Sequence, residues 1–231
     1  MKTIGLVGGI SWISTQDYYR YINEGVNEKL GDVNFARLII HSMNYGEIKK
    51  NNDANDWDAN FKLLCEASEN MKAGGAKAIV LCANTMHLLA DRLEEKIKLP
   101  VIHIATATAN EIKKQSLKKI ALLGTRFTME RNFFTDKLTA QNIQTVIPDD
   151  ADRDFIHWSI FEELGRGIVN PETKSRYISI IRKLVTQGAE GAILGCTEIP
   201  MLLQQKDLDI PVFDTTRIHS EAAVKFMLSD M

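Results

Sequence analysis

A short phrase that reads as a buried strand ending at a cysteine occurs twice in this chain, and this repeat constrains the fold more than any other feature. The first copy, GAKAIVLCANT, runs from Gly75 to Thr85, and the second, GAEGAILGCTE, runs from Gly188 to Glu198. Apolar strands that stop at small polar residues are typical of α/β proteins, whose ligands bind at the carboxyl ends of parallel strands. Two copies indicate two similar units that share one ligand.

The two copies differ at the cysteine. Counted from the first glycine of each copy, Cys196 corresponds to Ala83, and Cys82 lies one residue earlier. Neighbouring side chains on a strand point to opposite faces of the sheet. We therefore expect Cys82 to point away from the ligand, unless a bend at the strand end redirects it.

Apolar runs alternate with amphipathic stretches along the whole chain, which predicts parallel sheets with helices on both faces. Further segments are repeated: residues 2–9 resemble residues 119–125, and residues 99–102 resemble residues 210–213. Two α/β units related by an approximate twofold, with the ligand between them, are expected. The predicted strands are 3–8, 36–42, 78–82, 101–104, 119–124, 144–147, 191–196 and 211–213, and the polar residues 49–58 are expected to form a loop.

Composition excludes several classes of function. The chain has 231 residues and a formal net charge of −2, so it offers no basic surface for nucleic acid, and no apolar window is long enough for a membrane span. Three cysteines and no recognisable leader predict a cytoplasmic protein, with Cys65 as a core residue. The five histidines lack metal-ligand spacing, and the Gly8-Gly9 turn lacks the dinucleotide fingerprint, so neither a metal nor a nucleotide cofactor is expected.

Small polar residues follow four of the predicted strands. They form a ring of donors that fits a small zwitterion or a dicarboxylate, although the turn after Gly8-Gly9 is equally compatible with an ordinary strand-to-helix connection. The candidates are Ser11, Asn84, Thr85, Thr125, Thr128, Thr197 and Glu198.

Cys196 is the leading candidate for chemistry. A cysteine at a strand end, just before a helix, is expected to have its thiol pKa lowered by the helix amides from about 8.5 toward 7 or below, so that it can act as a base. The alternative is a buried structural cysteine, because free cysteines are among the most buried residues. The duplicated setting favours the catalytic interpretation.

Taken together, six motifs resemble the cofactor-independent aspartate/glutamate racemases. They span nearly the whole chain in order: GGISWIST (8–15), CANTMH (82–87), LGTRFTM (123–129), FEEL (161–164), GCTEI (195–199) and VFDT (212–215).

This resemblance implies two pseudo-symmetric three-layer α/β domains with parallel sheets, an active site in the cleft between them, and a homodimer. The C-terminal helix is expected to return to the first domain, which gives domains of residues 1–103 plus 213–231 and of residues 104–212. The implied activity is racemisation of aspartate, glutamate or both without pyridoxal phosphate. One cysteine thiolate removes the α-proton, and a thiol on the opposite face returns one.

Carried over to this chain, the resemblance gives Cys196 as one catalytic thiol. The second catalytic position falls at Ala83, or at Cys82 one residue before it. An amino acid substrate would be bound by Ser11, Asn52, Asn84, Thr85, Met86, Thr125, Thr128, Arg166, Thr197 and Glu198.

The missing thiol at Ala83 leaves several hypotheses open. Cys82 could replace it through an altered backbone, or Cys196 could work with water or another residue. A third hypothesis is a single-base reaction on a carbon acid, as in an isomerase or a decarboxylase. A catalytically silent amino acid-binding protein is the alternative outside enzymes, because fold alone does not decide function.

Overall fold

The computed structural model describes residues 1–230 and divides the chain into two compact units. The first unit comprises residues 1–103 and the segment from residue 219 onward, and the second comprises residues 104–218. The chain returns to the first unit later than the expected residue 213, because the strand at 212–214 pairs within the second sheet. No helix among the described residues has the length and apolar character needed to cross a membrane.

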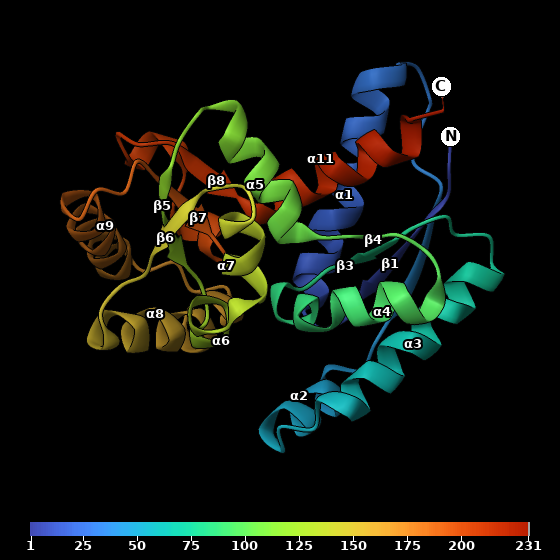
Figure 1. Cartoon of the computed structure of the whole chain (residues 1–231), viewed down its shortest axis with the longest axis horizontal. Helices are drawn as coiled ribbons and strands as arrows, with labels where there is room; N and C mark the ends of the chain where they lie inside the picture. Colours follow the sequence, from blue (N-terminus) through green and yellow to red (C-terminus); the bar gives the residue numbers. More distant parts are fainter. Residues whose placement is uncertain (231) are drawn as a thin grey trace. The chain divides into compact units, whose positions relative to one another are not determined.

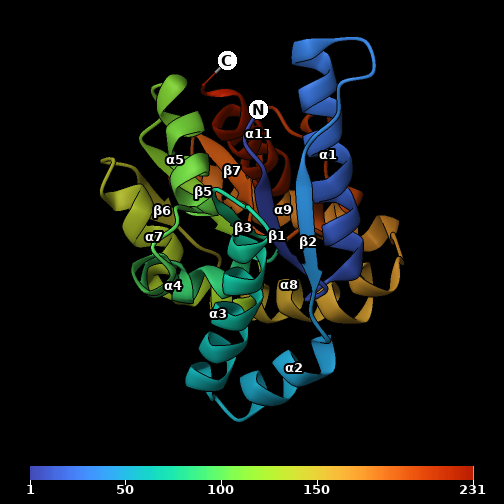
Figure 2. The same ribbon diagram turned by 90° about the vertical axis from the view of Figure 1, so that its right-hand side faces the viewer.

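The first unit is built on a four-stranded parallel sheet with the order β2-β1-β3-β4, so β2 lies at an edge (Figure 2). Strand β1 is buried along its whole length, as expected for a parallel sheet covered by helices on both faces. The elements are β1 (Ile4–Gly8), α1 (Trp12–Leu30), β2 (Leu38–Ser42), α2 (Tyr45–Asp53), α3 (Trp57–Ala73), β3 (Ile79–Leu81), η1 (Asn84–Leu89), α4 (Ala90–Ile97), β4 (Val101–Ile102) and most of α11 (Thr215–Leu228).

Side chains alternate between the two faces of this sheet. Val7 and Leu81 belong to the core on the side of α3 and α4, whereas Leu6 and Val80 belong to the core on the side of α1 and α11. The segment 49–58 corrects one expectation, because residues up to Asp53 continue α2 and only a short turn precedes α3. The amide of Gly46 donates to the Asn44 side chain, which caps this helix.

The second unit repeats this architecture. Its parallel sheet has the order β6-β5-β7-β8, so β5 and β7 occupy the central places that β1 and β3 occupy in the first sheet (Figure 1). All of the predicted strands are therefore present in two parallel sheets. The elements are α5 (Ile104–Lys114), β5 (Lys119–Leu123), α6 (Arg126–Glu130), α7 (Asn132–Thr139), β6 (Gln144–Val146), α8 (Asp150–Glu162), η2 (Leu164–Arg166), α9 (Pro171–Thr186), β7 (Gly191–Leu194), α10 (Ile199–Leu202), η3 (Gln205–Asp207) and β8 (Val212–Asp214).

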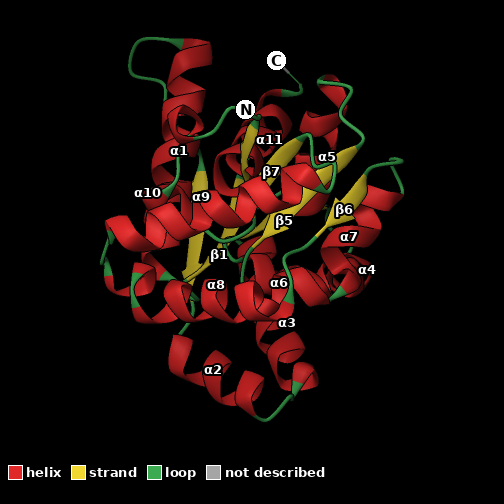
Figure 3. Cartoon of the chain, turned by 90° about the vertical axis from the view of Figure 1, so that its left-hand side faces the viewer, coloured by secondary structure: helices red, strands yellow, loops and turns green. Residues whose placement is uncertain are grey.

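Helices also cover the second sheet. Ala121 and Leu194 belong to a core with Ile156 of α8 and Tyr177 of α9, while α5 and α7 lie on the other side of the sheet (Figures 1 and 3). Burial on both faces explains why the strands read as continuous apolar runs rather than as alternating ones.

A buried polar cluster joins α1, β4 and α11 in the first unit. The Tyr18 hydroxyl donates to Nδ1 of His219 at 2.7 Å, and Nε2 of His219 donates to the carbonyl of Ile102 at 2.6 Å. The donor and acceptor roles of the two ring nitrogens follow because a carbonyl oxygen can only accept a hydrogen bond. The ring of His87 stands edge-on to that of His219, with centroids 5.2 Å apart. Burial lowers the pKa of His87 to about 4 and, together with the nearby His87, that of His219 to about 3.

We predict that acid weakens the folded state through these two histidines. The unfolded chain protonates them near their ordinary pKa of 6.5, whereas the folded unit stays neutral until much lower pH. Their contribution to stability is therefore present above pH 6.5 and is lost as the pH falls toward their folded pKa values. The loss amounts to about 2 kcal/mol per pH unit around pH 5.

Urea unfolding at a series of pH values measures this slope in the wild type and in His219→Gln. The glutamine amide can still accept from Tyr18 and donate to Ile102, but it cannot be protonated. We expect the variant to lose stability about half as steeply through this window, with one titrating histidine in place of two. Equal slopes would mean that His219 does not carry the effect.

Candidate active site at the strand ends

The turn after β1 is shaped by Gly9 and by two capping side chains. Gly9 has φ of +82°, and a Cβ there would lie 2.2 Å from the carbonyl oxygen of Met43, so only glycine fits. The Ser11 hydroxyl accepts the amide of Ser14 at 3.3 Å and begins α1. Thr15 Oγ1 accepts from the Gly9 amide and donates to the Ser11 carbonyl, both at 2.9 Å. The predicted residue Ser11 is thus held rigidly at the end of β1.

Strand β3 delivers Cys82 to the core and Ala83 to the opposite side. Cys82 is 1% exposed and packs with Tyr18 and Ala223, and its carbonyl accepts the Ser14 hydroxyl at 2.9 Å. Ala83 packs with the core on the α3 side of the sheet. Burial raises the pKa of the Cys82 thiol far above its ordinary value. The strand end therefore carries no bend that turns Cys82 toward the side of Ala83.

The turn after Ala83 is stabilised by His87. Its Nδ1 donates to the carbonyl oxygens of Ala83 at 3.1 Å and of Asn84 at 3.3 Å. Asn84 is largely buried, and Thr85 is partly exposed. Met86 is fully buried in the core, so its side chain supports the turn and does not fit the predicted contact with substrate.

In the second unit, Cys196 forms a hydrogen-bonded group with its two neighbours. Its thiol donates to Oε2 of Glu198 at 2.8 Å, and the Thr197 hydroxyl donates to the same oxygen at 2.8 Å. The preceding Gly195 allows close packing, since a Cβ there would lie 2.7 Å from the carbonyl oxygen of Leu123. Glu198, predicted as a substrate ligand, is therefore positioned as the partner of the thiol.

The expected lowering of the Cys196 pKa is wrong. Burial, followed by the charge and the hydrogen bond of Glu198, raises the pKa of this thiol well above its ordinary value. The backbone amides of Thr197 and Glu198 lower the pKa, as predicted, but their effect is smaller than that of burial and of the Glu198 charge. The following helix, α10, has only four residues, so its dipole adds little. At neutral pH the resting group is a thiol beside a carboxylate.

The end of β5 lies against the end of β7. A Cβ on Gly195 would lie 3.1 Å from Cγ2 of Thr128, which places this predicted residue beside the cysteine turn. The Thr125 hydroxyl caps α6 by accepting the amide of Thr128 at 3.3 Å. Thr125, Thr128 and Cys196 are thus brought together within the second unit.

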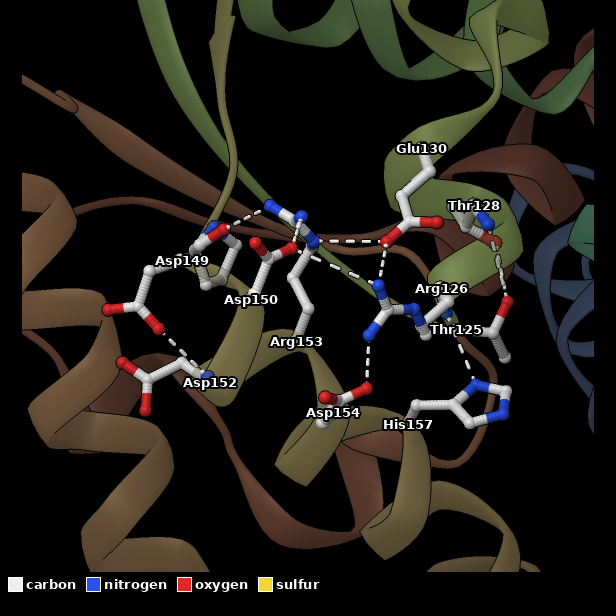
Figure 4. A network of polar contacts seen from close by, with 11 residues as sticks. Thr125, Arg126, Thr128, Glu130, Asp149, Asp150, Asp152, Arg153, Asp154 and His157 are labelled. Atoms are coloured by element: carbon white, nitrogen blue, oxygen red, sulfur yellow. Dashed lines mark hydrogen bonds and ion pairs between the residues drawn. The ribbon is translucent and has the colours of Figure 1, made fainter.

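Arg126, between the two threonines, is held by carboxylates of its own unit. Figure 4 shows its guanidinium paired with Asp154 and Glu130, the latter at 2.9 Å, while its backbone amide donates to Nδ1 of His157. Burial, with a smaller effect of the Arg126 charge, lowers the pKa of His157. This network fastens the threonine turn to α8.

Two further candidates have side-chain partners of their own. Asn52 accepts a hydrogen bond from the Asn60 side chain at 2.8 Å, and the exposed Arg166 pairs with Glu162. No cluster of three or more potential ligand side chains in residues 1–230 is arranged to hold a metal ion.

Sequence reasoning missed the surroundings of Cys196. Tyr177 is fully buried, its hydroxyl lies 2.9 Å from that of Ser159, and its raised pKa reflects first burial and then the nearby Cys196 and Glu163. In the sequence, Tyr177 occupies an ordinary core position of an amphipathic helix, so no local signal distinguishes it.

Comparison with known proteins places this arrangement in a family. The profile of the Asp/Glu/hydantoin racemases matches residues 7–223. This chain belongs to that racemase family.

Solved structures and a full-length relative agree with this assignment. A candidate Asp/Glu racemase from Yersinia pestis is 45% identical, with a TM-score of 0.95 over 99% of this chain and 100% of that one. An aspartate racemase homologue from Pyrococcus horikoshii OT3 is 34% identical, with a TM-score of 0.88 over 98% and 99% of the two chains. The broad specificity amino-acid racemase RacX of Bacillus subtilis is 23% identical over 98% of both chains.

For this racemase family member we predict that Glu198→Gln lowers the pKa of Cys196. The substitution removes the negative charge that disfavours the thiolate and keeps the size of the side chain. The pKa should fall, although burial keeps it above that of a free thiol.

The rate of iodoacetamide labelling at Cys196, followed by peptide mass spectrometry as a function of pH, measures this change. Cys65 on α3 serves as a reference thiol within the same molecule. An unchanged or higher pKa at Cys196 would show that Glu198 does not control the thiol.

Proposed function

We propose that this chain is an amino acid racemase acting on aspartate, glutamate or both, with Cys196 as the group that removes the α-proton and without pyridoxal phosphate. The observation that carries the proposal is the Cys196–Glu198 contact of 2.8 Å at a strand end, in a member of the racemase family. A nucleophilic or basic group beside a second titratable group is the arrangement expected for proton transfer.

Proton transfer begins with the thiol. Glu198 is placed to accept the thiol proton, which leaves a thiolate on Cys196 and a neutral carboxylic acid beside it. The raised pKa of the thiol makes the thiolate a strong base once it forms. It takes the α-proton of the amino acid, and the electron pair of the broken C–H bond moves toward the substrate carboxylate.

Binding of that carboxylate determines whether the step is feasible, because the α-proton of an amino acid is only weakly acidic. Hydrogen-bond donors fixed before the reaction stabilise the charge that develops in the transition state. We assign this task to Asn84 and Thr85, which follow β3, and to Thr128, which follows β5 and whose amide donates to the Thr125 cap. Thr197 keeps the carboxylate of Glu198 oriented toward the thiol.

Inversion needs a second proton donor, and the chain has alanine at the corresponding position 83. The burial of Cys82 in the core on the α1 side of the sheet supports a water molecule rather than this thiol as the donor. Under this proposal racemisation is slower than with a pair of thiols, because the donor is neither fixed in place nor matched in pKa.

We predict that Cys196→Ala abolishes exchange of the substrate α-proton. A positioned general base contributes about 10²- to 10⁴-fold, so the loss should reach this size. Proton NMR in D₂O with L-aspartate and then L-glutamate, followed by chiral analysis, measures exchange and inversion separately. Cys65→Ala is the matched control, since it removes the thiol on α3, which does not follow a strand.

Each outcome discriminates between the candidate functions. Exchange with inversion that depends on Cys196 supports the racemase, and exchange without inversion indicates a single-base enzyme. Binding of an amino acid without exchange, unaffected by Cys196→Ala, would indicate a silent binding protein. Full exchange in the Cys196→Ala variant would exclude this thiol as the base.

We also predict that Ala83→Cys increases the rate of racemisation by about tenfold or more, because it restores a thiol at the position equivalent to Cys196. Ala83→Ser is the control, with similar size and a hydroxyl that does not titrate near neutral pH. Cys82→Ala should leave the ratio of inversion to exchange unchanged. If Cys82→Ala instead abolished inversion, Cys82 would be the second acid.

A further inference from the structure

His157 on α8 supplies a hydrogen-bond acceptor to the start of α6. The backbone amide of Arg126, the first residue of α6, donates to Nδ1 of His157 at 3.3 Å (Figure 4). An amide at the first position of a helix has no acceptor within that helix. The ring of His157 therefore satisfies a donor that α6 itself leaves open, and it does so from a different helix.

Arg126 lies inside the threonine turn, residues 124–128, which carries two of the residues predicted to bind substrate. The Thr125 hydroxyl accepts the amide of Thr128 and lies 3.3 Å from the Thr128 hydroxyl. Thr128 is 1% exposed and packs beside Gly195, which precedes the catalytic candidate Cys196. A shift of the Arg126 backbone therefore changes the position of both threonines.

The contact fixes the protonation state of His157. Nδ1 accepts a hydrogen bond only when it carries no proton, so the ring is neutral with its hydrogen on Nε2. In the protonated ring both nitrogens are donors, and the N–H group on Nδ1 would face the N–H group of Arg126. Phe161 stands edge-on to the ring, with centroids 4.9 Å apart, and holds its plane. Protonation of this one side chain therefore breaks the contact, because two donors cannot share a hydrogen bond.

Charged groups from two helices face this ring. The Arg126 guanidinium on α6 disfavours the protonated form, whereas Glu130 on α6 and Asp154 on α8 favour it. Burial has the largest effect and lowers the pKa of His157 from its ordinary value of 6.5. On α9 and η2, which also pack against α8, Arg176 and Lys183 pair with Asp152, and Arg166 pairs with Glu162. His157 is therefore neutral at neutral pH and is protonated only in acid.

We propose that His157 is a positioning residue of the active site: its neutral ring holds the threonine turn in the conformation that binds substrate, and its protonation releases that turn. The proposal rests on the proposed racemase function. Because Cys196 keeps its own partner, Glu198, at 2.8 Å, release of the turn weakens substrate binding while the thiol stays in place. The racemase therefore binds its amino acid less tightly in acid than at neutral pH.

Amide NMR tests the contact without any substrate. Across a pH series, the resonance and the protection of the Arg126 amide should change with the same midpoint as the ring of His157, below pH 6.5. His157→Asn is the conservative variant, because its side-chain oxygen can accept the amide in place of Nδ1 and does not titrate. The Arg126 amide should then stay protected throughout the series. An amide that does not follow the His157 ring would overturn the proposal.

Steady-state kinetics with L-aspartate and L-glutamate test the effect on substrate binding. The KM of the wild type should rise by about tenfold as the pH falls through the His157 midpoint, which corresponds to the loss of one hydrogen bond. His157→Leu, which has no acceptor, should show the high KM at every pH. His157→Asn should restore the low KM and remove its rise in acid. Equal rises in the wild type and in His157→Asn would contradict the proposal.

Asp154→Asn gives an independent test that leaves the ring unchanged. The Asp154 charge favours the protonated ring, so its removal should move the midpoints of the Arg126 amide and of KM to lower pH. Asp136→Asn, at an exposed carboxylate on α7, is the matched control and should leave both midpoints in place. Midpoints that stay in place while the ring of the Asp154→Asn variant titrates at lower pH would exclude control by His157. If the wild type racemises no amino acid at any pH, the proposed function fails, and the Arg126 amide alone then decides whether His157 holds the turn.

Discussion

Both sheets are parallel and covered by helices on their two faces, so polar side chains can emerge only where the strands end. The chemistry of this chain depends on that constraint. Ser11 follows β1, Thr125 follows β5 and Cys196 follows β7, each beyond a strand that is almost entirely buried. Glycines at these ends let the backbones approach closely, as at Gly195 against the Leu123 carbonyl. The apolar strands therefore position the polar turns.

The pKa of Cys196 is set by burial and by the neighbouring Glu198 rather than by a helix. A cysteine before a helix is expected to be acidic, but α10 is a single short turn and the Glu198 carboxylate lies 2.8 Å from the sulfur. Desolvation and this negative charge both favour the neutral thiol. In the proposed mechanism, the base is stored as a thiol and forms by proton transfer to Glu198, and its strength suits a weakly acidic α-proton.

Much of the fold could be predicted from the sequence, and the candidate site only in part. The repeated apolar runs and the turn residues between them gave the strands and the duplicated α/β architecture. The chain returns to the first unit after residue 218 rather than after residue 212, because Val212–Asp214 pairs with β7, which is a long-range contact. The sequence predicts a loop over residues 49–58, whereas residues up to Asp53 belong to α2, because the polar composition hides the helix that begins after the Asn44 cap. Met86, which the resemblance gives as a substrate contact, is buried in the core.

The sequence by itself determined the family motifs, the two cysteine strands and the absence of a thiol at position 83. Period-two alternation was enough to separate Cys82 from Ala83, because adjacent side chains on a strand cannot share a face. Only the tertiary structure decided that the Cys196 pKa is raised and that Tyr177 lies near this thiol. These properties depend on burial and on distances between residues far apart in the chain, which a linear pattern does not contain.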